Sequence, residues 1–339
     1  MKYNSIGEQL IAKAQELDPS YKPDKFNDMS EAIDVILNNS GGSGYKIKKL
    51  TITENGLYDS ELEAYKPVYV SVPQVAQGGS LKAFLDGTKT TYHLFAQYKG
   101  ASIDGLISYS DTANVISMNN MFSQCPNLTT IPLLDTSNVT TMFSMFEYCS
   151  SLTTIPPLNT SNVATMYNMF YNCTSLTSIP QLDTSNNTSM ESMFYNCTNL
   201  ISIPQLNTYK VINMQSTFKN CTNLTTIPQL DTSNVQYFSA VFSGCSNLTS
   251  IPQLNLSSAN SLTQTFKGCT KLTSIGIYGF RYSIDITDTA LEHDALVAFL
   301  NQAGTAHNSS QRITIGSAKL AFLSDEEKAI ATNKGWTLA

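Results

Sequence analysis

Seven cysteines are the residues whose type and spacing most directly suggest chemistry in this chain. Neighbouring cysteines lie 24 residues apart, at Cys125, Cys149, Cys173, Cys197, Cys221, Cys245 and Cys269. They could form disulfides, bind a metal ion or line a buried column. Their number is odd, no Cys-x-x-Cys occurs, and all three histidines lie outside the cysteine-bearing segment, so a metal site is not expected. The pattern favours free, buried thiols.

A second column contains acid and amide side chains and raises the question of a calcium site. Its members are Asp111, Asp135, Asn159, Asp183, Asn207, Asp231 and Asn255. Carboxylates about 5 Å apart repel by about 1 kcal/mol in water, whereas an intervening asparagine can donate to its acidic neighbours. The column therefore favours a structural ladder over a calcium ladder, and we predict no metal site and no cofactor.

The cluster Glu292-His293-Asp294 places two acids beside a histidine, but it does not predict an active site. Adjacent residues on a helix do not face one another, and no nucleophile is spaced to join them. Neither a glycine-rich phosphate loop nor a metal-ligand spacing occurs. We therefore expect a protein that is not an enzyme and has no catalytic residues.

The fixed 24-residue period indicates a solenoid, because a unit of this size must stack on copies of itself to bury its apolar face. In a typical unit, Leu-Thr-Thr-Ile at 152–155 predicts a parallel strand rung that Pro156 ends. Val139, Met142 and Phe146 then share one face of a short helix. The predicted fold is an α/β solenoid of the leucine-rich-repeat type, with parallel strand rungs plus short helices. N-terminal helices, a small β module and a C-terminal α+β cap complete it.

The ends of the chain predict further units. The expected segments are an N-terminal helical anchor (1–40), a flexible linker (41–44), a small β module (45–75), an N-terminal cap of the solenoid (76–110), the repeat solenoid (111–277) and a C-terminal α+β cap (278–339). The anchor is too small for its own core, so its apolar residues should dock on a partner or on sister copies. These residues are Ile6, Leu10, Leu17, Ile33 and Leu37.

Three details of the caps can be tested. Tyr98 and Ala101 should occupy the phenylalanine and cysteine columns of a degraded first coil. Capping boxes at Thr289-x-x-Glu292 and Ser324-x-x-Glu327 should each open a helix.

Two sets of side chains on the coils are candidate ligand-facing groups. Paired threonines in the rung should point alternately inward and outward, so that the outer column forms a flat hydroxyl-rich surface. Tyrosines near the coil edge could stack on carbohydrate, although packing between coils explains them as well. The candidates are Tyr148, Tyr171, Tyr195, Thr153, Thr177 and Thr225.

Composition and charge exclude two classes of partner. Charged residues make up 14% of the chain and the net charge is −6, without the basic cluster typical of nucleic-acid binding. The sequence contains no apolar stretch of about 18 residues, so it predicts no membrane-spanning helix. The start of the chain is polar rather than a signal core, so we expect synthesis in a bacterial cytoplasm.

Short motifs resemble known families. The coils, with Cys-x-x-Leu-Thr-x-Ile-Pro and a following Met-Phe, resemble leucine-rich-like repeats of bacterial surface proteins. The segments 52–58 and 65–72 are similar to a small β module of tailed-phage structural proteins, and 323–337 is similar to C-termini of the same proteins. The resemblance implies a virion fibre or decoration component, on head or tail, that attaches to host-surface or mucus components.

This interpretation implies particular partners. The N-terminal helices would bind other virion proteins, the coils would bind a host-surface glycan or protein, and the chain would form a homo-oligomer. The alternative is a bacterial surface adhesin or protein-interaction repeat protein, derived from a prophage.

Overall fold

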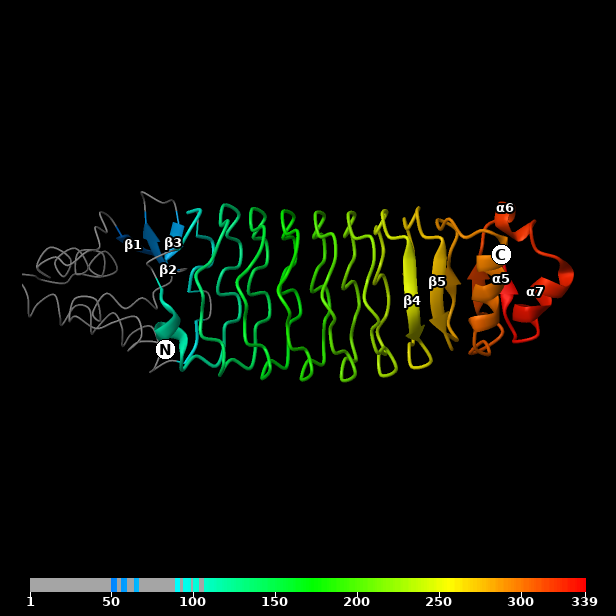
Figure 1. The fold of residues 1–339 in the computed structure, drawn as a ribbon, viewed down its shortest axis with the longest axis horizontal. Helices are drawn as coiled ribbons and strands as arrows, with labels where there is room; N and C mark the ends of the chain where they lie inside the picture. The colour runs from blue at the N-terminus through cyan, green and yellow to red at the C-terminus, as the bar shows by residue number, and fades with distance from the viewer. Residues whose placement is uncertain are drawn as a thin grey trace, which may run out of the picture.

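The computed structural model describes residues 50–53, 56–59, 64–66, 89–91, 94–98, 100–103 and 107–339. Figure 1 shows these residues in colour, with the coils stacked side by side along the long axis of the molecule. The predicted helical anchor and its linker lie outside the described residues. None of the described helices is long and apolar enough to cross a membrane.

A small antiparallel sheet precedes the coils in sequence. It contains β1 (Leu50–Thr53), β2 (Gly56–Asp59) and β3 (Ala64–Lys66), in the order β1-β2-β3. β1 and β2 pair with Thr53 opposite Gly56, and β2 pairs with β3 with Leu57 opposite Lys66. This sheet falls within the predicted β module at 45–75, whose boundaries remain a prediction.

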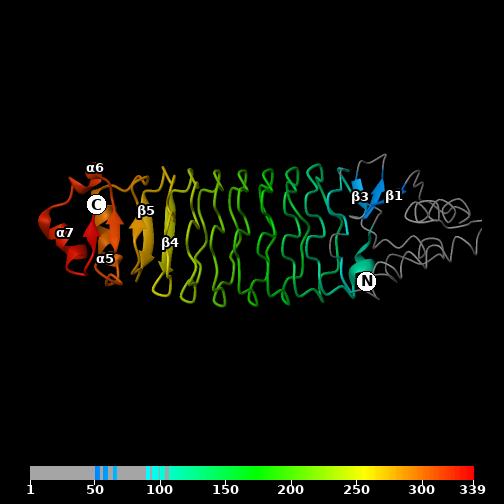
Figure 2. The same cartoon turned by 180° about the vertical axis from the view of Figure 1, so that it is seen from behind.

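The coils form a solenoid because equivalent residues lie over one another. The seven consecutive phenylalanine pairs from Phe95–Phe122 to Phe242–Phe266 have ring centroids 5.4 to 6.1 Å apart and planes within 8° of parallel. Isolated parallel bridges link one residue per coil from Thr90 to Ser261. The back view in Figure 2 shows the same straight stack of coils. Equivalent positions of successive coils therefore form columns along the axis.

The leucine and isoleucine of each coil face the interior, but the segment between them is not a pleated strand in most coils. Leu152, Ile155 and Leu158 are buried, whereas Thr153 and Thr154 are both exposed. The burial period is therefore three residues in this segment and not two. The prediction that paired threonines alternate between inside and outside is wrong, because strand alternation requires a period of two.

Regular rungs form only at the C-terminal end of the described coils. β4 (Ser250–Asn255) and β5 (Ser274–Tyr278) pair in parallel, with Ile251 opposite Ile275. The register shifts between Ile251 and Leu254, where Pro252 interrupts the ladder. The predicted rung sequence thus lies in the right place, but a strand ladder develops only next to the cap.

The methionine and phenylalanine segment differs from the short helix that its spacing predicts. Met145, Glu147 and Cys149 each donate their amide to the carbonyl three residues earlier, while the intervening amides of Ser144, Phe146 and Tyr148 donate to the next coil. Ser144 and Tyr148 have φ angles of 52° and 60°, which a continuing right-handed helix cannot contain. Successive turns therefore replace the helix and hydrogen-bond each coil to the next.

The first described coil is aligned differently from the prediction. Phe95, and not Tyr98, stacks on Phe122, with centroids 5.7 Å apart. Tyr98 donates its amide to Phe95 as Cys149 does to Phe146, so Tyr98 occupies the cysteine column. The assignment of Tyr98 and Ala101 to the phenylalanine and cysteine columns is wrong, because this coil does not keep the 24-residue offset.

Regular helices appear at the solenoid ends. A 3-10 helix, η1 (Tyr109–Thr112), lies in the first coil. The C-terminal cap contains a parallel sheet in the order β6-β7-β8, formed by β6 (Ile284–Asp285), β7 (Arg312–Thr314) and β8 (Thr337–Leu338). Its helices are α5 (His293–Gln302), α6 (Ser317–Leu320) and α7 (Asp325–Thr332). Figure 1 shows these elements closing the far end of the stack.

The two predicted capping boxes have different outcomes. At α7, the Ser324 hydroxyl accepts from the Glu327 amide and the Glu327 carboxylate accepts from the Ser324 amide, so this box is confirmed. Thr289 does not cap α5, because its hydroxyl donates to Ile286 and the helix begins at His293 after the cap residue Glu292. The box predicted at Thr289 is therefore wrong.

Candidate binding surfaces

The cysteine column lies in the interior of the solenoid, and all seven thiols are free and buried, as predicted. Each thiol from Cys149 to Cys269 donates to the carbonyl of the phenylalanine 27 residues earlier, with Sγ to O distances of 3.0 to 3.1 Å. Burial raises the pKa of Cys173 above its ordinary value and that of Cys269 to about 12. These thiols are neutral and serve packing, not chemistry.

Two of the candidate tyrosines lie in one column, which we call the tyrosine face and which is partly exposed from Glu147 to Lys219. It contains the residues two positions before the cysteines, namely Ser123, Glu147, Tyr171, Tyr195, Lys219, Ser243 and Lys267. The rings of Tyr171 and Tyr195 stack with centroids 4.5 Å apart and an interplanar angle of 10°. The Lys219 ammonium lies 5.4 Å from the centroid of the Tyr195 ring.

Tyr148 flanks the tyrosine face from the next column. Its ring is tilted by 56° against Tyr171, at a centroid distance of 5.5 Å, and the residue is exposed. Burial, followed by the neighbouring tyrosines, raises the pKa of the Tyr171 phenol. Because Tyr171 and Tyr195 cover each other's faces, Tyr148 has the most accessible ring of the three candidates.

The candidate threonines form a column that is only partly available to a ligand. Thr153, Thr177 and Thr225 are exposed, in the column four residues after the cysteines. The hydroxyl of Thr177 donates to the Thr153 carbonyl at 3.2 Å, and Thr225 makes the equivalent contact with Ile201 at 3.5 Å. Thr249 and Thr273 repeat this contact, so the hydroxyl donors of Thr177, Thr225, Thr249 and Thr273 are already used between coils.

A groove of about 740 Å³ follows the proline column in the middle of the solenoid. We call it the acceptor groove, and its lining is Gln181, Leu182, Asp183, Thr184, Gln205, Leu206, Asn207, Thr208, Gln229 and Asp231. The side-chain amide nitrogens of Gln181 and Gln205 each donate to the backbone carbonyl of the glutamine in the next coil, at 2.6 Å. The Gln229 side chain donates to the backbone carbonyl of Gln253. The donors of these three glutamine side chains are used in this way, whereas their side-chain oxygens remain acceptors.

The carboxylates of the acceptor groove are fixed by their own turns. One oxygen of Asp183 accepts from the Ser185 amide at 2.9 Å, and one oxygen of Asp231 accepts from the amide and hydroxyl of Ser233. Hydrogen bonds from these serines lower the pKa of both carboxyl groups. The second oxygen of each carboxylate adds an acceptor to the groove.

The asparagines of the acid and amide column close equivalent turns. Asn159 and Asn255 accept from the backbone amide two residues later, at 3.1 and 3.0 Å. From Asp135 to Asn255 each side chain of the column therefore closes its own turn and does not pair with the acid above or below, whereas Asp111 accepts from Ser108 at the start of η1. Among the described residues, no group of three His, Cys, Asp or Glu side chains could hold a metal ion.

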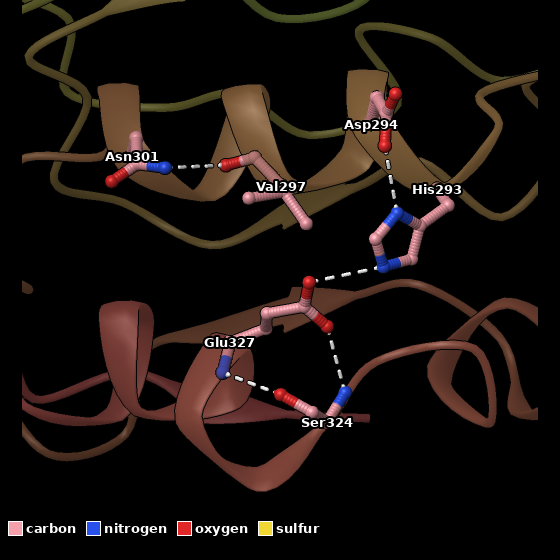
Figure 3. Close-up of polar contacts among 6 residues, drawn as sticks. All are labelled: His293, Asp294, Val297, Asn301, Ser324 and Glu327. Atoms are coloured by element: carbon pink, nitrogen blue, oxygen red, sulfur yellow. Dashed lines mark hydrogen bonds and ion pairs between the residues drawn. The ribbon is translucent and has the colours of Figure 1, made fainter.

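The acid and histidine cluster joins two helices of the cap. Figure 3 shows His293 between Asp294 and Glu327, with Nδ1 to Oδ1 and Nε2 to Oε1 distances of 2.9 and 3.0 Å. Hydrogen bonds to Asp294 and then Glu327 raise the pKa of His293, while the Ser324 amide lowers the pKa of Glu327. Glu327 is therefore committed to capping α7 and to His293, which is a structural arrangement.

Sequence reasoning missed the acceptor groove. Its glutamines recur every 24 residues directly after the proline, at Gln181, Gln205, Gln229 and Gln253. This recurrence of an amide at an exposed column was the available signal. The predicted anchor residues Ile6, Leu10, Leu17, Ile33 and Leu37 lie outside the described residues.

Stacked coils with leucine and isoleucine columns and parallel pairing define a solenoid of the leucine-rich-repeat type. The chain belongs to the family described as "Mycoplasma protein of unknown function, DUF285", whose model matches residues 89–202 and 177–280. These matches together cover more than half of the chain.

Two solved structures are similar to this chain. A leucine-rich repeat protein of T. pallidum is 17% identical, with a TM-score of 0.37, over 68% of this chain and 90% of its own. One from Bacteroides ovatus is 19% identical, with a TM-score of 0.36, over 67% of this chain and 64% of its own. No curated protein matches significantly. The fold assignment rests on the coils themselves.

Proposed function

We propose that this chain is a non-enzymatic attachment protein whose acceptor groove binds a polyhydroxylated ligand, such as a host-surface or mucus glycan. The observation that carries the proposal is the orientation of the groove's hydrogen-bonding groups. The amide nitrogens of Gln181, Gln205 and Gln229 donate to backbone carbonyls, which leaves acceptors toward the groove. Sugar hydroxyls supply the matching donors.

The dimensions and charge of the groove support this ligand class. Its volume of about 740 Å³ falls within the range of small-molecule sites. Asp183 and Asp231 lie two coils apart, on either side of the uncharged Asn207. Hydroxyl donors to a carboxylate form stronger hydrogen bonds than donors to an amide. A glycan chain lying along the solenoid axis would contact both acids.

We further propose that the solenoid is displayed on a tailed-phage particle, as a fibre or decoration component made in the host bacterial cytoplasm. The phage-like motifs at 52–58, 65–72 and 323–337 support this placement. Residues 1–40 would bind other virion proteins. Several copies on one particle would convert weak glycan contacts into useful avidity.

The groove can be tested with a conservative double substitution. In Asp183→Asn with Asp231→Asn, each new amide oxygen can still accept from the turn, as Asn159 does at 3.1 Å. Loss of both charged acceptors should weaken glycan binding about tenfold or more, measured by calorimetry on hits from a glycan array. Asp135→Asn is the matched control, because Asp135 closes the same turn outside the groove.

Two results would contradict the groove proposal. One is unchanged affinity of the double variant for a glycan that the wild-type chain binds. The other is the absence of any glycan ligand for the full chain on a broad array.

The second candidate is a bacterial surface adhesin, possessing the same groove but displayed on a cell. Membership of a family described from Mycoplasma favours it. Mass spectrometry of purified particles and of cell-surface fractions separates the two placements. Detection on the cell surface and absence from particles would overturn the phage assignment while leaving the glycan proposal intact.

A further inference from the structure

The order of residues on the tyrosine face is nearly symmetric about the midpoint between Tyr171 and Tyr195. Moving outward from that point, tyrosine corresponds to tyrosine and Glu147 to Lys219, followed by the buried Ser123 and Ser243. If a second copy runs in the opposite direction, its Lys219 therefore lies opposite Glu147 of the first copy. A surface with this property is complementary to a second copy of itself that runs in the opposite direction.

The solenoid is straight enough for such a column to match a partner over several coils. Ring planes of consecutive phenylalanines from Phe122 to Phe218 differ by only 3 to 8°. Their centroid spacing stays between 5.4 and 5.6 Å over the same coils. Equivalent residues thus keep one direction and one spacing, which an antiparallel copy would share.

The charges at either end of this symmetric segment have no ion-pair partner among the described residues. Glu147 and Lys219 are both partly exposed, and neither forms an ion pair with another residue that the structure describes. Within the part of the chain that the structure describes, the Lys219 ammonium lies against the face of Tyr195. Both charges are therefore available to a partner.

The same polarity extends along the coils. Between residues 111 and 191 the charged residues are all acidic, namely Asp111, Asp135, Glu147, Asp183 and Glu191. Between residues 210 and 271 they are Lys210, Lys219, Asp231, Lys267 and Lys271. Two parallel copies would place like charges together, whereas two antiparallel copies place the acidic half of one beside the basic half of the other.

We propose that two copies of this chain associate through the tyrosine face as an antiparallel dimer, with a two-fold axis between Tyr171 and Tyr195. Glu147 of each copy meets Lys219 of the other, so the contact is formed twice. The half-buried tyrosine rings form the apolar centre, as aromatic residues do in many interfaces.

The neighbouring column is compatible with this axis. Asn172 and Asn196 lie beside the two tyrosines, and the Asn196 amide donates to Asn172 Oδ1 at 2.5 Å. An asparagine side chain retains both donor and acceptor capacity, so Asn172 of one copy can pair with Asn196 of the other across the axis. The acceptor groove begins about half a coil away in sequence and would stay open in the dimer, so the dimer does not depend on the glycan proposal.

Charge reversal of the full chain tests the dimer by sedimentation velocity. Glu147→Lys or Lys219→Glu alone should weaken the dimer about tenfold or more, because each creates two like-charge contacts. The double variant restores opposite charges and should recover the wild-type sedimentation coefficient at the same concentration. Lys328→Glu, in helix α7 of the cap and outside the coils, is the control reversal and should leave the association unchanged.

Two outcomes overturn the proposal. A wild-type chain that sediments as a monomer at about 100 μM excludes a stable dimer of ordinary affinity. An oligomer whose mass is unaffected by both single reversals must be formed by another surface. A mixing experiment adds an independent test: Asn172→Cys and Asn196→Cys chains should cross-link with each other on oxidation, since the native thiols are buried.

Discussion

The coils and the C-terminal cap of this molecule are stabilised in different ways. In the coils, each buried residue packs against its equivalent in the coil before and after, as in the phenylalanine pairs 5.4 to 6.1 Å apart. In the cap, single residues make contacts that occur once. Trp336 packs on Phe280 and donates its indole N–H to the Gly304 carbonyl at 2.8 Å.

This difference indicates how each region should respond to damage. A column loses two neighbouring contacts when one member is removed, but the coils farther away keep theirs, because a solenoid is stabilised mainly by nearest-neighbour contacts. The cap has no copies of its contacts. A lost contact there should affect the cap as a unit.

The largest expected effect comes from removing one ring of the column. Phe194→Ala should cost about 3–5 kcal/mol, because its ring lies between Phe170 and Phe218 and leaves a cavity. Hydrogen exchange should show faster opening of adjacent coils while the cap amides stay protected. Phe299→Ala is the counterpart in the cap and should reverse this pattern. Equal loss of protection throughout the molecule in both variants would contradict the comparison.

The next largest loss of stability is expected from substituting a lysine of the cap. The Lys334 ammonium donates to the carbonyls of Asn301 and Ala303 at 2.8 and 2.9 Å, where α5 ends. Lys334→Met should cost about 1–3 kcal/mol, because it leaves these carbonyls without that donor. Urea unfolding followed by the fluorescence of Trp336, the only tryptophan, reports this region.

Lys328→Met is the control for that substitution. Lys328 contacts exposed Asp325 at 3.4 Å, and such surface pairs contribute roughly 0–1 kcal/mol. Equal destabilisation by the two substitutions would show that the carbonyl contacts of Lys334 do not stabilise the cap.

Backbone strain in the coils can be tested at two glycines of one column. Gly244 and Gly268 have φ angles of +78° and +73°, and a Cβ at Gly244 would lie 2.3 Å from Asn220 Oδ1. Gly268→Ala should cost about 1–2 kcal/mol from the left-handed conformation alone. Gly244→Ala should cost more, because it adds the clash. Chemical denaturation of both variants measures the difference, and an equal cost would mean that Asn220 moves aside freely.

The smallest effect should be the pH dependence of the cap. Because hydrogen bonds raise the pKa of His293 when folded, its stabilisation is complete below about pH 6.5 and is lost as the pH rises through the folded pKa. The melting temperature of wild type relative to His293→Gln should therefore be higher at about pH 5.5 than at about pH 8.5. A difference independent of pH would show that the imidazolium contributes nothing.

Much of the fold follows from the sequence period. Because residues 24 positions apart lie over one another, the burial of Cys149, Leu152 and Ile155 could be predicted without coordinates. The capping box at Ser324 could be predicted as well, since it depends on local hydrogen bonds. The alignment of the first coil could not be predicted, because the stacked residues Phe95 and Phe122 are not 24 positions apart.

The turns of the methionine segment could not be predicted from the sequence for a different reason. Met142, Met145 and Phe146 have a spacing that fits both a helix and a series of turns. The left-handed residues Ser144 and Tyr148 distinguish the two, and neither is a glycine that would have indicated a positive φ. Hydrogen bonds to the next coil hold them in this conformation, and only the stacked structure contains those partners.

The sequence by itself determined which residues share a column, because a fixed period places equivalent positions at the same point of each coil. It also determined that the coils have few charges. Only the tertiary structure decided which polar atoms remain available, because the close approach of coils uses the hydroxyl donor of Thr177, the amide nitrogen of Gln205 and the ring faces of Tyr171 and Tyr195 within the chain. The atoms left over define the candidate binding surfaces.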